Sequence, residues 1–124
     1  MKIQAINTIE KHWLVISIII LSSITVLSLI PLKALADAPG SDKTRHLICY
    51  AALAFPASLR RPTGWIYMIL LFAVYSGMIE VIQPYVNRHG EWLDLIANIS
   101  GLLIGAILAL WARALQAKFI DWRK

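Results

Sequence analysis

The sequence predicts an all-α, four-helix integral membrane protein with both termini in the cytoplasm. Two observations predict this class: apolar residues make up 59% of the 124 residues, and charged residues make up only 15%. A soluble domain carries about 25% charged residues, which it needs for its water-facing surface. The length is that of one domain, so residues 1–124 are treated as a single membrane domain.

Four segments are predicted to be membrane helices. Residues 13–32 contain no charge, and 20 helical residues at about 1.5 Å each cover a hydrocarbon core of roughly 30 Å. The second helix, 42–59, is less apolar, so its charged first turn is expected at the headgroups. The third and fourth helices are predicted over 65–83 and 93–111, each with a carboxylate near one end.

The connections and the tail are polar. Pro39 and Gly40 indicate a turn between the first two helices, and residues 60–64 form a short basic turn after the second. The tail, 112–124, has apolar residues at helical spacing among basic ones, which is typical of a helix lying on an anionic leaflet. Ala34 and Ala36 also fit a signal-peptide cleavage pattern, but the preceding apolar segment is long, which favours an uncleaved helix.

The orientation follows from the basic residues. Eight of the 12 Lys and Arg residues lie in the N-terminus, the turn at 60–61 and the C-terminal tail. Cytoplasmic segments carry an excess of Lys and Arg, so these three segments are predicted to be inside. The same distribution argues against nucleic acid as a partner, despite the net charge of +5. The single cysteine, Cys49, excludes an intrachain disulfide.

Polar residues from three of the helices are predicted to meet at the outer membrane boundary. Successive helices run in opposite directions, so the start of the second, the end of the third and the start of the fourth lie at one depth. Within each pair the spacing is three or four residues, which places both side chains on one helix face. The pairs are Asp42 and His46, Glu80 and Gln83, and Asp94 and Asn98. Ionisable groups in a membrane are costly, about 2.5–3.5 kcal/mol each at a helix centre, so a functional role is the default expectation.

Simpler interpretations stay open for several of these residues. Asp42 is a natural N-cap for the second helix. Arg88 could contact lipid phosphates alone. The whole cluster could be a polar network that only fixes helix register. In the fourth helix, Gly101 and Gly105 form a small-residue ladder with Ala97 and Ala109, which predicts close helix packing.

No metal site and no cofactor are predicted. His46, Glu80 and Asp94 are possible ligand types, but the sequence has no tight ligand spacing such as H-E-x-x-H. Gly-rich phosphate-binding loops are also absent from the sequence. The sequence does not specify an oligomeric state.

Two blocks of the sequence resemble the VanZ-like family of small membrane proteins. The segment SDKTRHLICYAAL (41–53) resembles the family's D-K-x-x-H-x-x-x-Y pattern. The segment 79–108 is similar to its second block, with E-x-x-Q, an Arg, and D-x-x-x-N-x-x-G-x-x-x-G. The resemblance covers residues 41 to about 111, and Arg45 is an added charge beside the histidine. It implies a multi-pass protein of the bacterial cytoplasmic membrane, in the cell envelope, and an association with lowered susceptibility to the glycopeptide teicoplanin.

The predicted function is binding of an amphiphilic envelope ligand in an outer-leaflet polar pocket. Membrane lipids and a lipid-linked precursor or glycopeptide are the expected partners. The ligand-binding residues would be Asp42, Lys43, His46, Glu80, Gln83, Arg88, Asp94 and Asn98. The alternative is a small membrane enzyme that performs acid–base chemistry on an envelope lipid, with His46, Glu80 and Asp94 as its catalytic residues.

Overall fold

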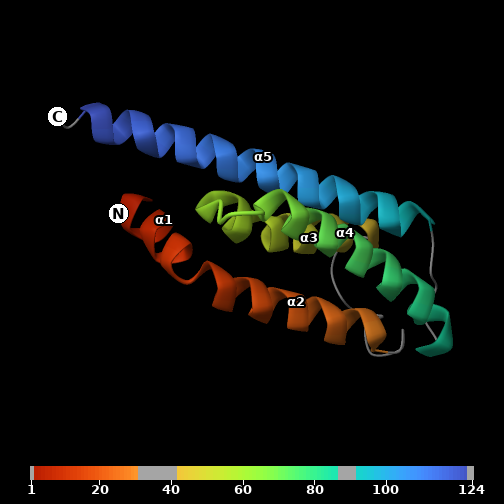
Figure 1. Ribbon diagram of the computed structural model, residues 1–124. Coiled ribbons are helices and arrows are strands. Elements are labelled where there is room, and N and C mark those ends of the chain that lie inside the picture. The colour runs from red at the N-terminus through yellow and green to blue at the C-terminus, as the bar shows by residue number, and fades with distance from the viewer. Residues whose placement is uncertain (1, 31–41, 87–91, 123–124) are drawn as a thin grey trace.

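The structure, a computed structural model, describes residues 2–30, 42–86 and 92–122, and all elements within these ranges are helices (Figure 1). This confirms the all-α class. The elements are α1 (Lys2–Lys11), α2 (Trp13–Leu29), α3 (Asp42–Arg60), α4 (Trp65–Ile82), the 3₁₀ turn η2 (Gln83–Val86) and α5 (Trp92–Trp122). The possible cleavage pattern at Ala34 and Ala36 lies outside the described residues.

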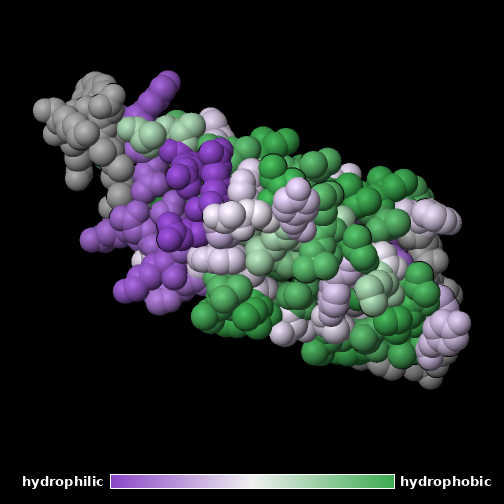
Figure 2. Space-filling view, viewed as in Figure 1, coloured by the Kyte–Doolittle hydropathy of each residue, from purple (hydrophilic) through white to green (hydrophobic). Residues whose placement is uncertain are grey.

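Two of the helical segments are long and apolar enough to cross a membrane. They are Trp65–Val86 and Trp92–Phe119, and a third span results if α1 and α2, which meet at a bend of 75°, count as one. The side chains on the outside of these helices are mostly apolar, for example Leu71 at 62% and Ile107 at 63% exposure. On the face shown in Figure 2, apolar residues predominate along the middle of the molecule, and hydrophilic residues gather at the end that carries the termini. A surface of this kind suits lipid rather than water.

The helix α3 does not meet the same test, although four spans were predicted. Its first turns carry charges, and it ends at Arg60. It packs along α5 over most of its length and also contacts α1, α2 and α4. Polar and charged side chains of membrane helices face other helices rather than lipid, so a helix enclosed in a bundle tolerates a lower hydropathy. Its low hydropathy is therefore consistent with its position.

The packing of α3 on α5 depends on two glycines. A Cβ atom on Gly101 would collide with the backbone oxygen of Leu47, and one on Gly105 would collide with the backbone oxygen of Ala51. Any side chain at these positions would push the two helices apart. Such close backbone approach is typical of helix pairs in membranes.

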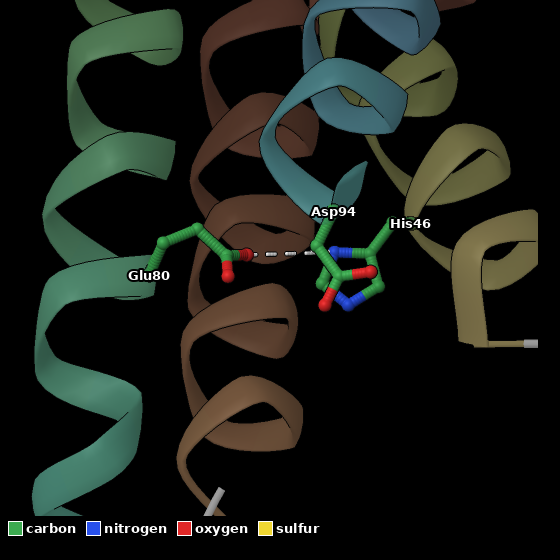
Figure 3. Close-up of side chains that lie close together, drawn as sticks. All are labelled: His46, Glu80 and Asp94. Atoms are coloured by element: carbon green, nitrogen blue, oxygen red, sulfur yellow. Dashed lines mark ion pairs between the residues drawn. The ribbon is translucent and has the colours of Figure 1, made fainter. Parts of the chain in front are cut away.

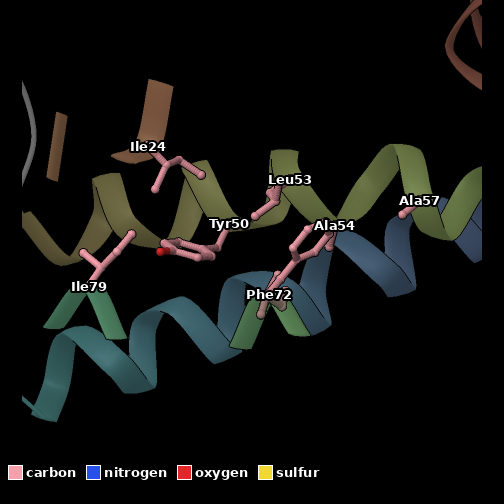
Figure 4. Close-up of a cluster of buried hydrophobic side chains, with 8 residues drawn as sticks. Ile24, Tyr50, Leu53, Ala54, Ala57, Phe72 and Ile79 are labelled. Carbon is pink, nitrogen blue, oxygen red and sulfur yellow. The ribbon is translucent and has the colours of Figure 1, made fainter. Parts of the chain in front are cut away.

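A buried apolar cluster fills the centre of the bundle. It combines Ile24 of α2, Tyr50 and Leu53 of α3, and Phe72 and Ile79 of α4 (Figure 4). Tyr50 and Leu53 are 2% and 0% exposed. Leu102 of α5 also belongs to the cluster, which therefore joins four helices, α2, α3, α4 and α5.

Two helical segments differ from the sequence prediction. The helix α1 was not predicted; its half-buried side chains Ile6 and Ile9 are three residues apart on one face, a stripe too short to stand out in sequence. The fourth membrane helix was predicted over 93–111, followed by a separate amphipathic helical tail, whereas the structure has one continuous helix, α5, that extends to Trp122. Residues 106–122 contain neither Gly nor Pro, and good helix formers such as Ala, Leu, Gln and Lys let the helix continue.

Candidate functional site

The bundle has two ends of different character. At one end, α2 and α4 finish and α3 and α5 begin (Figure 1). We call this the cluster end, because it holds His46, Glu80, Asp94 and Asn98. The opposite end, called here the terminal end, consists of α1, the turn at 60–64 and α5 from Arg113 onward. Its exposed side chains include Lys11, Arg61 and Lys118.

Three helices each contribute an ionisable side chain to the cluster. His46 comes from α3, Glu80 from α4 and Asp94 from α5, and the three side chains converge (Figure 3). Their potential ligand atoms all lie within 4.8 Å of one another. His46 Nδ1 and Glu80 Oε1 are 4.0 Å apart. The structure thus brings together residues that are 34 and 48 positions from His46 in the sequence.

A buried amide positions the imidazole. His46 Nδ1–H donates to Asn98 Oδ1 at 2.8 Å, a bond that joins α3 to α5. Asn98 is 0% exposed, so this bond is shielded from water and its geometry is restricted by the packing around it. The tautomer with the proton on Nδ1 leaves a lone pair on Nε2. The bond therefore restricts the orientation of the His46 ring between α3 and α5.

The cluster is enclosed rather than open. The side chains of His46 and Glu80 are each 9% exposed, and Asp94 is 2% exposed. Buried ionisable groups are stable only when paired or hydrogen-bonded. The sequence predicted that these residues line a pocket, and the structure shows their side chains buried between the helices.

Further polar residues directly precede His46 on α3. Lys43 and Thr44 are exposed, and Arg45 is half-buried. The side chain of Asp42, the predicted capping or binding residue at the start of α3, lies outside the described part of the chain, and so does Arg88. The structure therefore does not test their predicted roles.

Gln83 makes a contact that the sequence analysis did not predict. Its Nε2 donates to the backbone oxygen of Ser28 at 3.1 Å, which ties η2 to the last turn of α2. The sequence analysis grouped Gln83 with the ligand-binding residues and did not include α2 in the site. A signal for α2 exists in the sequence: Ser17, Ile24 and Ser28 are spaced by seven and four residues, and all three are buried on one face.

Tyr50 was named in the sequence only through the family pattern. It lies one turn after His46 on α3 and is 2% exposed. Its hydroxyl has no hydrogen-bond partner among the described residues. The Glu80 carboxylate is near enough to interact with it electrostatically. Tyr50 is thus a further polar group beside the cluster, one helical turn farther from the cluster end than His46.

A comparison with known protein families found a match that covers most of the chain. The VanZ/LLP1 family model matches residues 6–113, which includes all four residues of the cluster. Searches of curated proteins and of solved structures found no significant match. Since the family model covers most of the chain, the protein belongs to the VanZ family.

Proposed function

We propose that this VanZ-family protein lies in the bacterial cytoplasmic membrane with its cluster end outward, where it binds an amphiphilic ligand of the cell envelope. The observation that carries the proposal is the convergence of His46, Glu80 and Asp94 from three helices at one end of the bundle. A purely structural bundle has no need to bury three ionisable groups together, because apolar side chains of similar size would cost less free energy.

The arrangement around the cluster indicates how the ligand would be held. Lys43 is exposed and Arg45 half-buried at the start of α3, where they can meet a phosphate or carboxylate group of the ligand. Arg88, which lies outside the described residues, is a further candidate by sequence. The enclosed carboxylates and Asn98 would accept or donate hydrogen bonds to hydroxyl or amide groups that enter between the helix ends. The lipid tail of the ligand would remain against the apolar outer faces.

The proposed orientation has four spans and cytoplasmic termini. It is supported by the charge distribution: the terminal end carries exposed Lys11, Arg60, Arg61 and Lys118, as expected for the cytoplasmic side. In this arrangement α3 crosses within the bundle, covered by its neighbours. A glycopeptide with a lipid tail or a lipid-linked wall precursor matches the chemistry of the outward end.

The proposal is tested by the teicoplanin susceptibility of a sensitive Gram-positive host. The host would express wild type, Glu80→Gln, Lys43→Gln and the control Cys49→Ala at matched membrane levels. We expect protection from wild type and the control, loss of protection with Glu80→Gln, and partial loss with Lys43→Gln. Protection that survives Glu80→Gln, or an absence of protection from wild type, would contradict the proposal.

A second candidate function is acid–base catalysis on an envelope lipid. It is favoured by one observation: the imidazole of His46 and the carboxylate of Glu80, two group types that acid–base catalysis commonly uses, lie together in a buried site. A changed lipid or precursor profile in cells that overproduce wild type, absent with Glu80→Gln, would support the enzyme. An unchanged profile would rule it out.

A further inference from the structure

The cluster has the composition of a metal site. Each of His46, Glu80 and Asp94 offers a ligand atom, and these atoms lie within 4.8 Å of one another in a buried position (Figure 3). We propose that these three side chains bind one divalent transition-metal ion of the Zn²⁺ or Mn²⁺ type. The sequence predicted no metal site, because the ligands come from three helices and therefore form no local motif.

The ligand set selects the kind of metal. One imidazole with two carboxylates is a mixed nitrogen and oxygen set, which suits Zn²⁺ and Mn²⁺ better than Cu⁺, which prefers sulfur, or Ca²⁺, which prefers oxygen alone. Bonds of about 2.0–2.2 Å place neighbouring ligand atoms roughly 3.2–3.6 Å apart. Metal binding would therefore require the ligand atoms, which lie within 4.8 Å of one another, to move closer together by rotation of the Glu80 and Asp94 side chains.

Asn98 supplies the outer support that metal-binding histidines usually have. A histidine ligand commonly donates its other N–H to a carbonyl or carboxylate oxygen, which fixes the ring and its tautomer. His46 Nδ1–H makes this bond to Asn98 Oδ1 at 2.8 Å. The lone pair is then on Nε2, which is the nitrogen assigned to the metal. Asn98 is a positioning residue and not a ligand.

The buried hydroxyl of Tyr50 is a second, independent observation at this place. It has no hydrogen-bond partner in the described part of the chain, it is 2% exposed, and it lies near the Glu80 carboxylate. Three protein ligands leave a coordination position for a water molecule. A hydrogen bond from Tyr50 to that water, or to the Glu80 carboxylate when it binds the metal, would satisfy the hydroxyl.

This inference concerns the same residues as the proposed function but does not rest on it. A metal ion could join the ends of α3, α4 and α5 whether or not the protein binds an envelope ligand. Metal binding is measured on the purified protein without any ligand, so the two proposals can fail separately.

The test is metal binding by the full-length protein in detergent, purified without a polyhistidine tag and stripped with a chelator. Zn²⁺ affinity and stoichiometry would be measured by calorimetry, and Co²⁺ would serve as a spectroscopic probe of the ligand set. The variants are Glu80→Gln and Asp94→Asn, which preserve side-chain shape. The controls lie at the terminal end: Glu10→Gln makes the same change as Glu80→Gln but in α1, and His12→Asn removes a histidine next to α1.

We expect one Zn²⁺ per wild-type chain and an unchanged affinity in both controls. Affinity should fall at least about ten-fold in Glu80→Gln and Asp94→Asn, with loss of the Co²⁺ absorption bands. Size-exclusion elution and circular dichroism would establish that each variant is folded. Absence of stoichiometric binding by wild type, or equal binding by wild type and the folded cluster variants, would overturn the proposal.

Discussion

The cluster end and the terminal end are both polar, but they hold their polar side chains differently. At the cluster end, Asp94 and Asn98 are 2% and 0% exposed and lie between helices. At the terminal end, Lys11, Arg61 and Lys118 are exposed. Figure 2 shows a hydrophilic surface region at this end of the molecule. Matched changes at the two ends should therefore have unequal effects, since a buried polar group loses a specific partner and an exposed one is rehydrated.

The largest effect is expected where α3 and α5 hold the cluster end together. A Cβ on Gly105 would collide with the backbone oxygen of Ala51 and lie 2.8 Å from its carbonyl carbon. Gly105→Ala should therefore reduce the free energy of unfolding by an amount at the upper end of the usual overpacking range of about 1–3 kcal/mol. Unfolding in mixed detergent micelles measures this difference.

Gly77→Ala is the matched control for that change. A Cβ on Gly77 would meet only Leu95 Cδ1, at 4.0 Å, which is an ordinary contact. This variant should be as stable as wild type or slightly more stable. Equal losses in the two variants would show that the close approach of α3 and α5 is not what stabilises the bundle.

A smaller effect is expected for Asn98→Leu. This change removes the acceptor of the His46 Nδ1–H bond and leaves a buried donor, at a cost of about 1–3 kcal/mol. Asn7→Leu is its counterpart at the terminal end, where exposed Asn7 accepts a bond from Gln116 Nε2. It should change stability by less than about 0.5 kcal/mol. Thermal unfolding of both variants in one detergent measures the two losses of stability. Similar losses in Asn98→Leu and Asn7→Leu would contradict the expected difference between the two ends.

Arg113→Gln tests an arginine of the terminal end that bonds to the backbone of another helix. Arg113 Nη1 donates to the backbone oxygen of Leu59 at 2.8 Å, near the C-terminus of α3. A cation at this position also interacts favourably with the helix dipole. Its loss should cost about 1 kcal/mol. Lys118→Gln, at an exposed position on the same helix, should leave the stability unchanged in the same assay. A larger loss of stability in Lys118→Gln than in Arg113→Gln would contradict the stabilising role assigned to Arg113.

The smallest effect is expected midway between the two ends. The Tyr75 hydroxyl and the Thr25 hydroxyl form a hydrogen bond that links α4 to α2. Interhelical hydrogen bonds in membrane proteins contribute about 0.6 kcal/mol on average. Tyr75→Phe should lose about that amount, measured by the same unfolding assay. Tyr67→Phe, whose side chain is 78% exposed, should lose nothing.

The sequence predicted the helical class and the residues that meet, because both follow from simple periodicity. Alternating helix directions place His46, Glu80 and Asp94 at one depth, and spacing within each helix places them on one face. The sequence did not predict how enclosed they are, since burial depends on how closely α3 approaches α5. Gly101 and Gly105 indicated a close approach, but not which residues of α3 would lie against them.

The differences between the predicted and the observed helices and contacts have local physical causes. Gln83 has two donors and can reach either the cluster or α2, and sequence spacing does not reveal that Ser28 offers a backbone acceptor there. The continuation of α5 depends on the absence of a breaking residue, whereas the prediction gave more weight to the rise in charge after Trp111. The helix α1 is amphipathic over only ten residues, and short helices of this kind depend on tertiary contacts for stability.

The central claim is that the cluster end faces outward and the terminal end faces the cytoplasm. It is tested by labelling single cysteines at two exposed positions, Thr44→Cys and Lys118→Cys, in a Cys49→Ala background with a membrane-impermeant thiol reagent. The account predicts that Thr44→Cys is labelled in intact cells and that Lys118→Cys is labelled only after permeabilisation. Labelling of Lys118→Cys in intact cells, with protection of Thr44→Cys, would contradict it.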